Sequence, residues 1–204
     1  QGYATIAAEA IEASAASGQA AYTHVLLQGG VGGLAAGVVA YWWEHAGAAR
    51  PKFIVVEPEQ ADCLWQSAVH GQASVAQGTV DSIMAGLACG ATSPLAWRFL
   101  DSSVDAFMTV SDDEAITAMR QLAAGSERDI PVLAGESGVA GLAALNQLAA
   151  NKQQMAALGL DEHARVLFIS SEGATAPSVY AEAVGETAEA VLARQQQWLA
   201  KQTA

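Results

Sequence analysis

Five short runs of apolar residues, each leading into a turn and a helical segment, constrain the fold most strongly. They are residues 24–28, 52–58, 106–110, 130–135 and 164–170. A strand that is apolar throughout is buried on both faces, which is typical of a parallel sheet covered by helices on both sides. The 204 residues contain no fixed-period repeat and no low-complexity linker. We therefore predict one α/β domain over residues 1–204, with a parallel sheet and helices on both of its faces.

The spacing of apolar residues between these runs predicts the helices. They cover residues 4–17, 32–46, about 60–67, 83–90, 94–102, 111–124, 136–152 and most of 177–201. The helix from Ser111 has the clearest start, because a serine N-cap is followed by acids in the first turn.

Composition narrows the classes of protein that fit. Hydrophobic residues make up 52% of the chain and the formal net charge is −12, which indicates a globular protein without a basic surface for nucleic acid or an anionic membrane. No apolar run is long enough to span a bilayer and no signal peptide is recognised, so we expect a soluble, cytoplasmic protein. The four histidines are too scattered to predict a metal site. Cys63 and Cys89 are expected to be reduced, with a bridge between them left open.

Ligands of parallel α/β sheets bind at the carboxyl ends of the strands, and this rule sorts the candidate residues. On that edge we expect Gly29–Gly33, Glu57, Ser111, Gly135–Gly138 and Ser170–Gly173. The three lysines of the chain, Lys52, Lys152 and Lys201, fall before a strand, after a helix and in the tail. None of them is therefore expected near the chemistry.

The glycine turn after the first strand is the strongest candidate for a binding site. Gly29, Gly30, Gly32 and Gly33 permit positive φ and let successive N–H groups point inward, and a helix N-terminus follows. Such a turn suits a phosphate, although a purely structural turn has the same composition.

Two ligands fit a phosphate cradle of this kind. Gly30, Gly32 and Ala35 match the G-x-G-x-x-A pattern and Glu57 ends the next strand, so a nicotinamide-dependent oxidoreductase is one alternative. Glu57 has an equally good structural interpretation as an acid that fixes a neighbouring loop. A smaller phosphorylated cofactor is the other ligand, and a non-catalytic module that senses a phosphorylated metabolite is a further alternative.

Several longer motifs resemble those of diaminopropionate ammonia-lyases, which are pyridoxal-phosphate enzymes of the tryptophan-synthase-β-like fold type II. The motifs, in order, are "LLQGGVGGLAAGV", "IVVEPEQADCLW", "DSIMAGLACGATSPLAW", "GESGVAGLAAL" and "VLFISSEG". The resemblance runs across nearly all of the chain. It implies that Gly29, Gly30, Val31, Gly32 and Gly33 form the loop that binds the cofactor phosphate.

The resemblance also implies partners for the pyridine ring. A hydroxyl at the end of a late strand contacts the ring nitrogen in this fold type, and Ser171 is the matching residue. Ser137 is the alternative and Glu136 lies beside it in the same motif. A neutral hydroxyl would leave the nitrogen unprotonated, which suits β-elimination. Capping of the following turn is an equally good interpretation of Ser171.

One part of the family pattern is missing. A pyridoxal-phosphate lyase needs a lysine that forms a Schiff base with the cofactor, and the resemblance places it in an N-terminal half to which nothing here corresponds. The chain thus resembles the C-terminal half of an enzyme that converts 2,3-diaminopropionate to pyruvate and ammonia. We expect the isolated chain to be inactive, and the resemblance implies a homodimer and a small amino-acid substrate.

Overall fold

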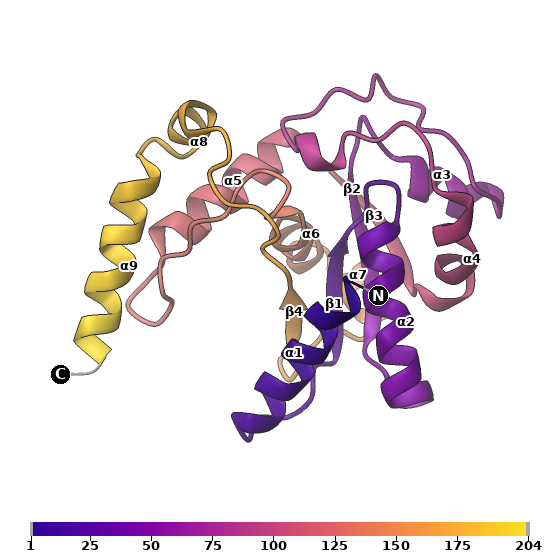
Figure 1. The fold of residues 1–204 in the computed structure, drawn as a ribbon, viewed down its shortest axis with the longest axis horizontal. Helices are drawn as coiled ribbons and strands as arrows, with labels where there is room; N and C mark the ends of the chain where they lie inside the picture. Colours follow the sequence, from indigo (N-terminus) through magenta and orange to yellow (C-terminus); the bar gives the residue numbers. More distant parts are fainter. Residues whose placement is uncertain (1, 203–204) are drawn as a thin grey trace.

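The computed structural model describes residues 2–202 and contains a four-stranded parallel sheet (Figure 1). The strands are β1 (His24–Gln28), β2 (Lys52–Pro58), β3 (Ala106–Val110) and β4 (Val166–Phe168), in the order β3-β2-β1-β4. Every neighbouring pair is parallel, with His24 opposite both Lys52 and Val166. The predicted α/β class with a parallel sheet is confirmed.

Helices cover both faces of this sheet. The α-helices are α1 (Ala4–Ala16), α2 (Gly33–Ala46), α3 (Cys63–His70), α4 (Pro94–Ser103), α5 (Asp112–Ala124), α6 (Ala140–Ala149), α7 (Lys152–Leu158), α8 (Pro177–Val184) and α9 (Ala188–Gln202), and η1 (Gly47–Ala49) and η2 (Ala85–Leu87) are 3-10 turns. Alternate strand residues feed two apolar cores. Val25, Leu27 and Phe53 pack with α1–α4, whereas Leu26 and Ile54 pack with α5, α6 and the C-terminal helices.

Helix α5 begins where the sequence predicts. The Ser111 side chain accepts a hydrogen bond from the N–H of Glu114, and the Glu114 carboxylate accepts one from the N–H of Ser111. This reciprocal capping box satisfies two of the amides that a helix N-terminus leaves unpaired.

The prediction of a strand at 130–135 is wrong. The N–H groups of this segment do not pair with one neighbouring strand. The N–H of Val132 donates to Leu122 O and that of Gly135 donates to Glu172 O, both at 2.8 Å. Pro131 has no N–H to contribute to a ladder. Leu133 and Ala134 still pack into a core, so the apolar run reports burial rather than strand pairing.

Three helix predictions also differ from the structure. The helix expected over 136–152 begins only at Ala140 and ends at Ala149, and α7 follows it as a separate helix. Residues 83–90 form only the 3-10 turn η2, and α3 starts at Cys63, three residues later than the expected start at about 60. The delay at α3 arises because a turn closes first, with the N–H of Ala61 bonded to Pro58 O at 3.0 Å.

The C-terminal helices α8 and α9 lie beside α5 at the end of the molecule away from β2 and β3 (Figure 1). Arg194 of α9 pairs with Glu186 and donates to Ala123 O at the end of α5. Within residues 2–202, no helix has the length and hydropathy that crossing a membrane requires.

Candidate functional site

A cavity of about 460 Å³ opens at the carboxyl ends of β1 and β4. Its walls come from the glycine turn, the η2 segment, the loop before α6 and the loop after β4. The lining residues are Tyr3, Gln28, Gly29, Gly30, Val31, Gly33, Leu34, Gly86, Leu87, Cys89, Ser137, Ser171, Glu172, Gly173 and Thr175. The predicted edge of the sheet is therefore where this cavity lies.

Three glycines of the turn are required by the backbone or by packing. Gly30 and Gly32 have φ of +58° and +97°, in the left-handed region that favours glycine. A Cβ at Gly29 would lie 2.5 Å from Glu57 Cγ, and one at Gly32 would lie 3.0 Å from Ala96 Cβ. Gly33 differs, because a Cβ there would meet no atom within 4 Å although the residue lines the cavity.

The turn leaves amides available to a ligand. Among residues 2–202, no protein acceptor pairs with the N–H groups of Gly30, Gly33 and Leu34. Gly33 and Leu34 form the start of α2 and line the cavity, so the positive end of the helix dipole lies at the cavity wall. A phosphate group fits this arrangement, since it would accept the free N–H bonds and occupy the space that a side chain at Gly33 would fill.

Two serines lie in the same cavity. Ser171 Oγ accepts a hydrogen bond from Gln28 Nε2 at 3.1 Å. Ser137 Oγ accepts one from the N–H of Gly86 at 3.0 Å, and the N–H of Ser137 donates to the Glu172 carboxylate at 2.7 Å. The structure thus brings both predicted hydroxyls to the cavity that holds the glycine turn.

Glu136 occupies a different position from its neighbour Ser137. It does not line the cavity, its exposed fraction is 4%, and its Oε1 has no hydrogen-bond partner among the described residues. Direct contact between Glu136 and a ligand is therefore not supported by the geometry.

Glu57 serves the fold. Its carboxylate accepts hydrogen bonds from the N–H groups of Leu64 at 3.0 Å and Trp65 at 2.8 Å, at the start of α3. The side chain is fully buried, and burial raises the pKa of Glu57 to about 7 despite these two bonds. Because the carboxylate is engaged by α3 and does not line the cavity, the geometry does not support the ribose contact that a dinucleotide would need.

Both cysteines are free thiols near the turn. Cys63 Sγ donates to Gly30 O at 3.4 Å, and Cys89 lines the cavity. Burial raises the pKa of Cys63 to about 12 and also raises the pKa of Cys89. A high pKa keeps a thiol protonated at neutral pH, so neither cysteine is activated as a nucleophile.

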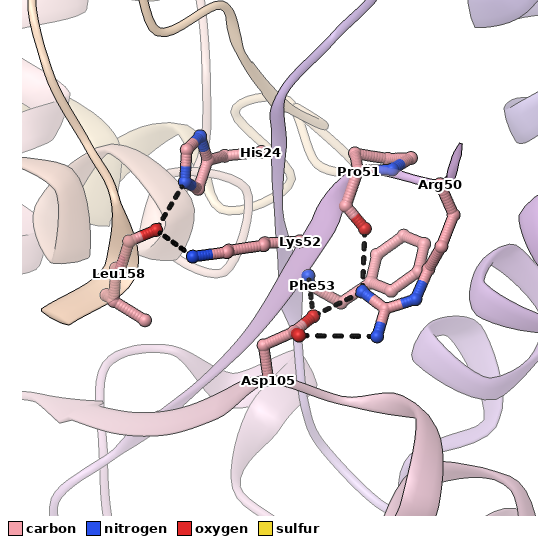
Figure 2. Close-up of polar contacts among 7 residues, drawn as sticks. All are labelled: His24, Arg50, Pro51, Lys52, Phe53, Asp105 and Leu158. Atoms are coloured by element: carbon pink, nitrogen blue, oxygen red, sulfur yellow. Dashed lines mark hydrogen bonds and ion pairs between the residues drawn. The ribbon is translucent and has the colours of Figure 1, made fainter. Parts of the chain in front are cut away.

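The lysines lie away from the cavity, as the sequence predicts. Lys52 Nζ donates to Leu158 O at 2.7 Å, and His24 Nε2 donates to the same oxygen at 2.9 Å (Figure 2). Beside them, Asp105 pairs with Arg50 and accepts from the N–H of Phe53 (Figure 2). These contacts hold the amino-end edge of the sheet. Lys152 starts α7, Lys201 lies in α9, and none of the three lines the cavity.

Sequence reasoning missed several lining residues, of which Gln28 is the most polar and the most buried. It ends β1 with an exposed fraction of 2%. The sequence does contain a signal for Gln28, because a polar residue ends an apolar strand directly before the glycine turn. Tyr3, Leu87, Cys89 and Thr175 were also missed, because their approach depends on contacts that are distant in sequence.

Comparison with known proteins agrees with this geometry. Residues 1–172 match the family described as pyridoxal-phosphate dependent enzymes. A diaminopropionate ammonia-lyase from Salmonella typhimurium is 42% identical over 190 residues, which cover 90% of this chain and 47% of that protein. The chain therefore spans about half the length of the curated relatives it matches.

Solved structures of ammonia-lyases are also similar to this chain. The diaminopropionate ammonia-lyase of Escherichia coli, in complex with an aminoacrylate-PLP azomethine reaction intermediate, aligns with a TM-score of 0.79 and 39% identity over 90% of this chain and 47% of that one. A fungal L-serine ammonia-lyase from Rhizomucor miehei aligns with a TM-score of 0.72 and 21% identity, over 92% of this chain and 56% of that one. This second likeness concerns the fold alone.

Proposed function

The chain belongs to the pyridoxal-phosphate dependent enzymes, and from this premise we propose that it is the C-terminal half of a diaminopropionate ammonia-lyase. In this proposal residues 1–204 form the α/β domain that binds the cofactor phosphate. The whole protein would convert 2,3-diaminopropionate to pyruvate and ammonia. The observation that carries the proposal is one cavity with a phosphate cradle and two inward hydroxyls.

The cradle is the part of the site that fits the cofactor most directly. The amides of Gly30, Gly33 and Leu34 would donate to the phosphate oxygens, and the dipole of α2 would stabilise their charge. Gly29 and Gly32 would hold the backbone in this shape, and Val31 would cover the outer side with its half-exposed side chain.

The hydroxyl of Ser171 would complete the site, with Ser137 as the alternative. When bound, pyridoxal phosphate supplies an electron sink for negative charge that develops at the α-carbon of an amino acid. Ser171 would donate its hydroxyl hydrogen to the ring nitrogen and leave that nitrogen without a proton. This weaker sink favours loss of the β-amino group, which is the elimination that the proposed reaction needs.

The lysine that forms the Schiff base would lie outside this chain. Among residues 2–202, no lysine lines the cavity, and Lys52 is already bonded at the other end of the sheet. The proposal therefore gives this half the roles of binding and orienting the cofactor. Proton transfer at the substrate would depend on the other half.

We also propose a cytoplasmic homodimer. An interface on this half is supported by the large apolar side chains that α3 and α4 expose. Val69, Leu95 and Phe99 have exposed fractions of 58%, 67% and 50%. Monomeric proteins rarely expose a contiguous patch of such residues without a partner.

The direct test is pyruvate release by the full-length protein supplied with 2,3-diaminopropionate and pyridoxal phosphate. We expect pyruvate and ammonia to accumulate, and L-serine supplied at the same concentration serves as a comparison of substrates. If the protein binds the cofactor but acts on serine alone, the substrate assignment is wrong. If it shows neither cofactor binding nor product, the lyase proposal fails.

A further inference from the structure

Gln28 is a buried polar residue at the end of an otherwise apolar strand segment. It closes β1 after Leu26 and Leu27, and its side chain reaches the cavity wall. Its Oε1 is buried and has no hydrogen-bond partner among the described residues. An unpaired buried oxygen costs free energy.

The carbonyls around Gln28 determine how its amide is oriented. Nε2 donates to Ile169 O and lies 3.5 Å from Gly138 O. Carbonyl oxygens only accept hydrogen bonds, so the amide nitrogen, which carries the hydrogens, must face them. The second hydrogen of the same group is then directed to Ser171 Oγ at 3.1 Å, which is closer than Gly138 O at 3.5 Å.

This contact sets the direction of the Ser171 hydroxyl. Its oxygen already accepts from Gln28, and within residues 2–202 its hydrogen has no protein acceptor. Ser171 therefore presents a donor to whatever occupies the cavity. The Gln28 amide occupies one of the two lone pairs of this oxygen, and its positive end makes the oxygen a poorer acceptor for a second donor, such as a protonated ring nitrogen.

We infer that Gln28 is a positioning residue that fixes the Ser171 hydroxyl as a donor and so keeps the ring nitrogen of bound pyridoxal phosphate unprotonated. This inference rests on the proposed function, since it requires the cofactor in this cavity. It concerns Ser171 rather than Ser137, because Ser137 Oγ accepts from the N–H of Gly86 and has no contact with Gln28. It also explains why an amide, which has two hydrogens, is needed to serve Ile169 O and Ser171 Oγ together.

The test uses the full-length protein loaded with pyridoxal phosphate that carries ¹⁵N in its ring. The ¹⁵N chemical shift, followed against pH, reports whether the nitrogen holds a proton. In the wild-type protein we expect an unprotonated nitrogen at neutral pH, with protonation only towards the acid end of the pH range, where its midpoint serves as the reference for the variants. A protonated nitrogen at neutral pH in the wild-type protein would overturn the inference without any variant.

Two variants address Gln28 itself. Gln28→Glu keeps the shape but has at most one hydrogen, so it cannot serve both acceptors, and its oxygen can draw the Ser171 hydrogen to itself. Gln28→Met removes the amide altogether. Both should raise the proton affinity of the ring nitrogen at least about tenfold, one pKa unit, and Ser171→Ala should shift it in the same direction. Gln147→Met, a like substitution on α6 away from the cavity, controls for the change of residue type.

The outcomes separate this inference from the proposed function. A ring nitrogen that responds to Ser137→Ala but to neither Gln28 variant would assign the contact to Ser137 and overturn the role of Gln28. Failure of the wild-type protein to bind the cofactor would instead refute the proposed function. Variants that bind the cofactor with an unchanged ¹⁵N titration would refute the role of Gln28 alone.

Discussion

Gly32 and Gly33 are neighbours in the turn, but glycine is needed at each for a different reason. Gly32 has φ of +97° and a Cβ there would lie 3.0 Å from Ala96 Cβ and Leu100 Cδ1, so the fold requires it. At Gly33 the backbone allows any residue and a Cβ would meet open space. If the space belongs to a phosphate, glycine at 33 is kept for the ligand rather than for the fold.

Substituting each residue with alanine separates these roles. Gly33→Ala should leave the free energy of unfolding unchanged or raise it by up to about 1 kcal/mol, because alanine suits a helix better than glycine. It should weaken pyridoxal-phosphate binding by the full-length protein at least about tenfold, which is about 1.4 kcal/mol. Gly32→Ala should lower the free energy of unfolding by about 1–3 kcal/mol through backbone strain. Urea unfolding and cofactor titration measure the two quantities, and unaltered cofactor affinity in Gly33→Ala would contradict the cradle.

Glu57 predicts a pH dependence of stability. Its pKa is about 7 in the folded protein, whereas an exposed glutamate, as in the unfolded chain, has a pKa of 4.5. Between these two pH values the folded protein holds a proton that the unfolded chain releases. The associated stability is present below pH 4.5 and is lost as the pH rises to about 7, by about 3 kcal/mol. Glu57→Gln cannot ionise, so its free energy of unfolding lacks this dependence on pH. As the pH rises, the wild-type protein should therefore lose about 3 kcal/mol of stability relative to the variant. Urea unfolding at pH values on both sides of this window tests it, and a constant difference would contradict the buried carboxyl.

At the scale of elements, the N-cap of α5 carries a local prediction. Ser111→Ala removes the oxygen that accepts from Glu114 N–H and should lower the free energy of unfolding by about 1 kcal/mol. Ser102→Ala, on the exposed last turn of α4, is the matched control and should change little. Equal effects of the two substitutions would show that the capping box does not stabilise the fold.

The elements also show what a sequence can predict. The strand, glycine turn and helix at 24–46 are correctly predicted because the signals are adjacent in the chain, and so is the start of α5. The segment 130–135 was mistaken for a strand because pairing depends on partners that are far away in sequence. The role of Glu57 stayed open for a similar reason, since its partners are amides of α3, whose start the sequence placed three residues too early.

The candidate site follows the same division. The turn at 29–33 and the serines could be placed on one edge from strand order alone. Gln28 could not be assigned a role, because its contacts Gly138, Ile169 and Ser171 lie 110 to 143 residues along the chain. Which hydroxyl meets the ring depends on how the folded chain places Ser137 and Ser171 in the cavity, and these positions come from contacts that are distant in sequence.

At the scale of the whole molecule, this chain has a cavity suited to holding a cofactor but no lysine to anchor it. The described residues place Lys52 at the opposite edge, and the chain covers about half of its curated relatives. We therefore expect the 204-residue chain alone to bind pyridoxal phosphate weakly and to release no pyruvate. The full-length protein is expected to bind the cofactor tightly and to release pyruvate. Pyruvate formation by the isolated chain, measured beside the full-length protein, would show that the missing lysine is not required.

We propose above that the turn at 29–33 holds the phosphate of pyridoxal phosphate. A crystal structure of the full-length protein with the cofactor bound would show where the phosphate lies. We expect phosphate oxygens on the N–H groups of Gly30, Gly33 and Leu34, with the ring nitrogen beside Ser171 Oγ. A cofactor bound in another cavity, or in this one with its phosphate away from the turn, would show that the turn does not bind the phosphate.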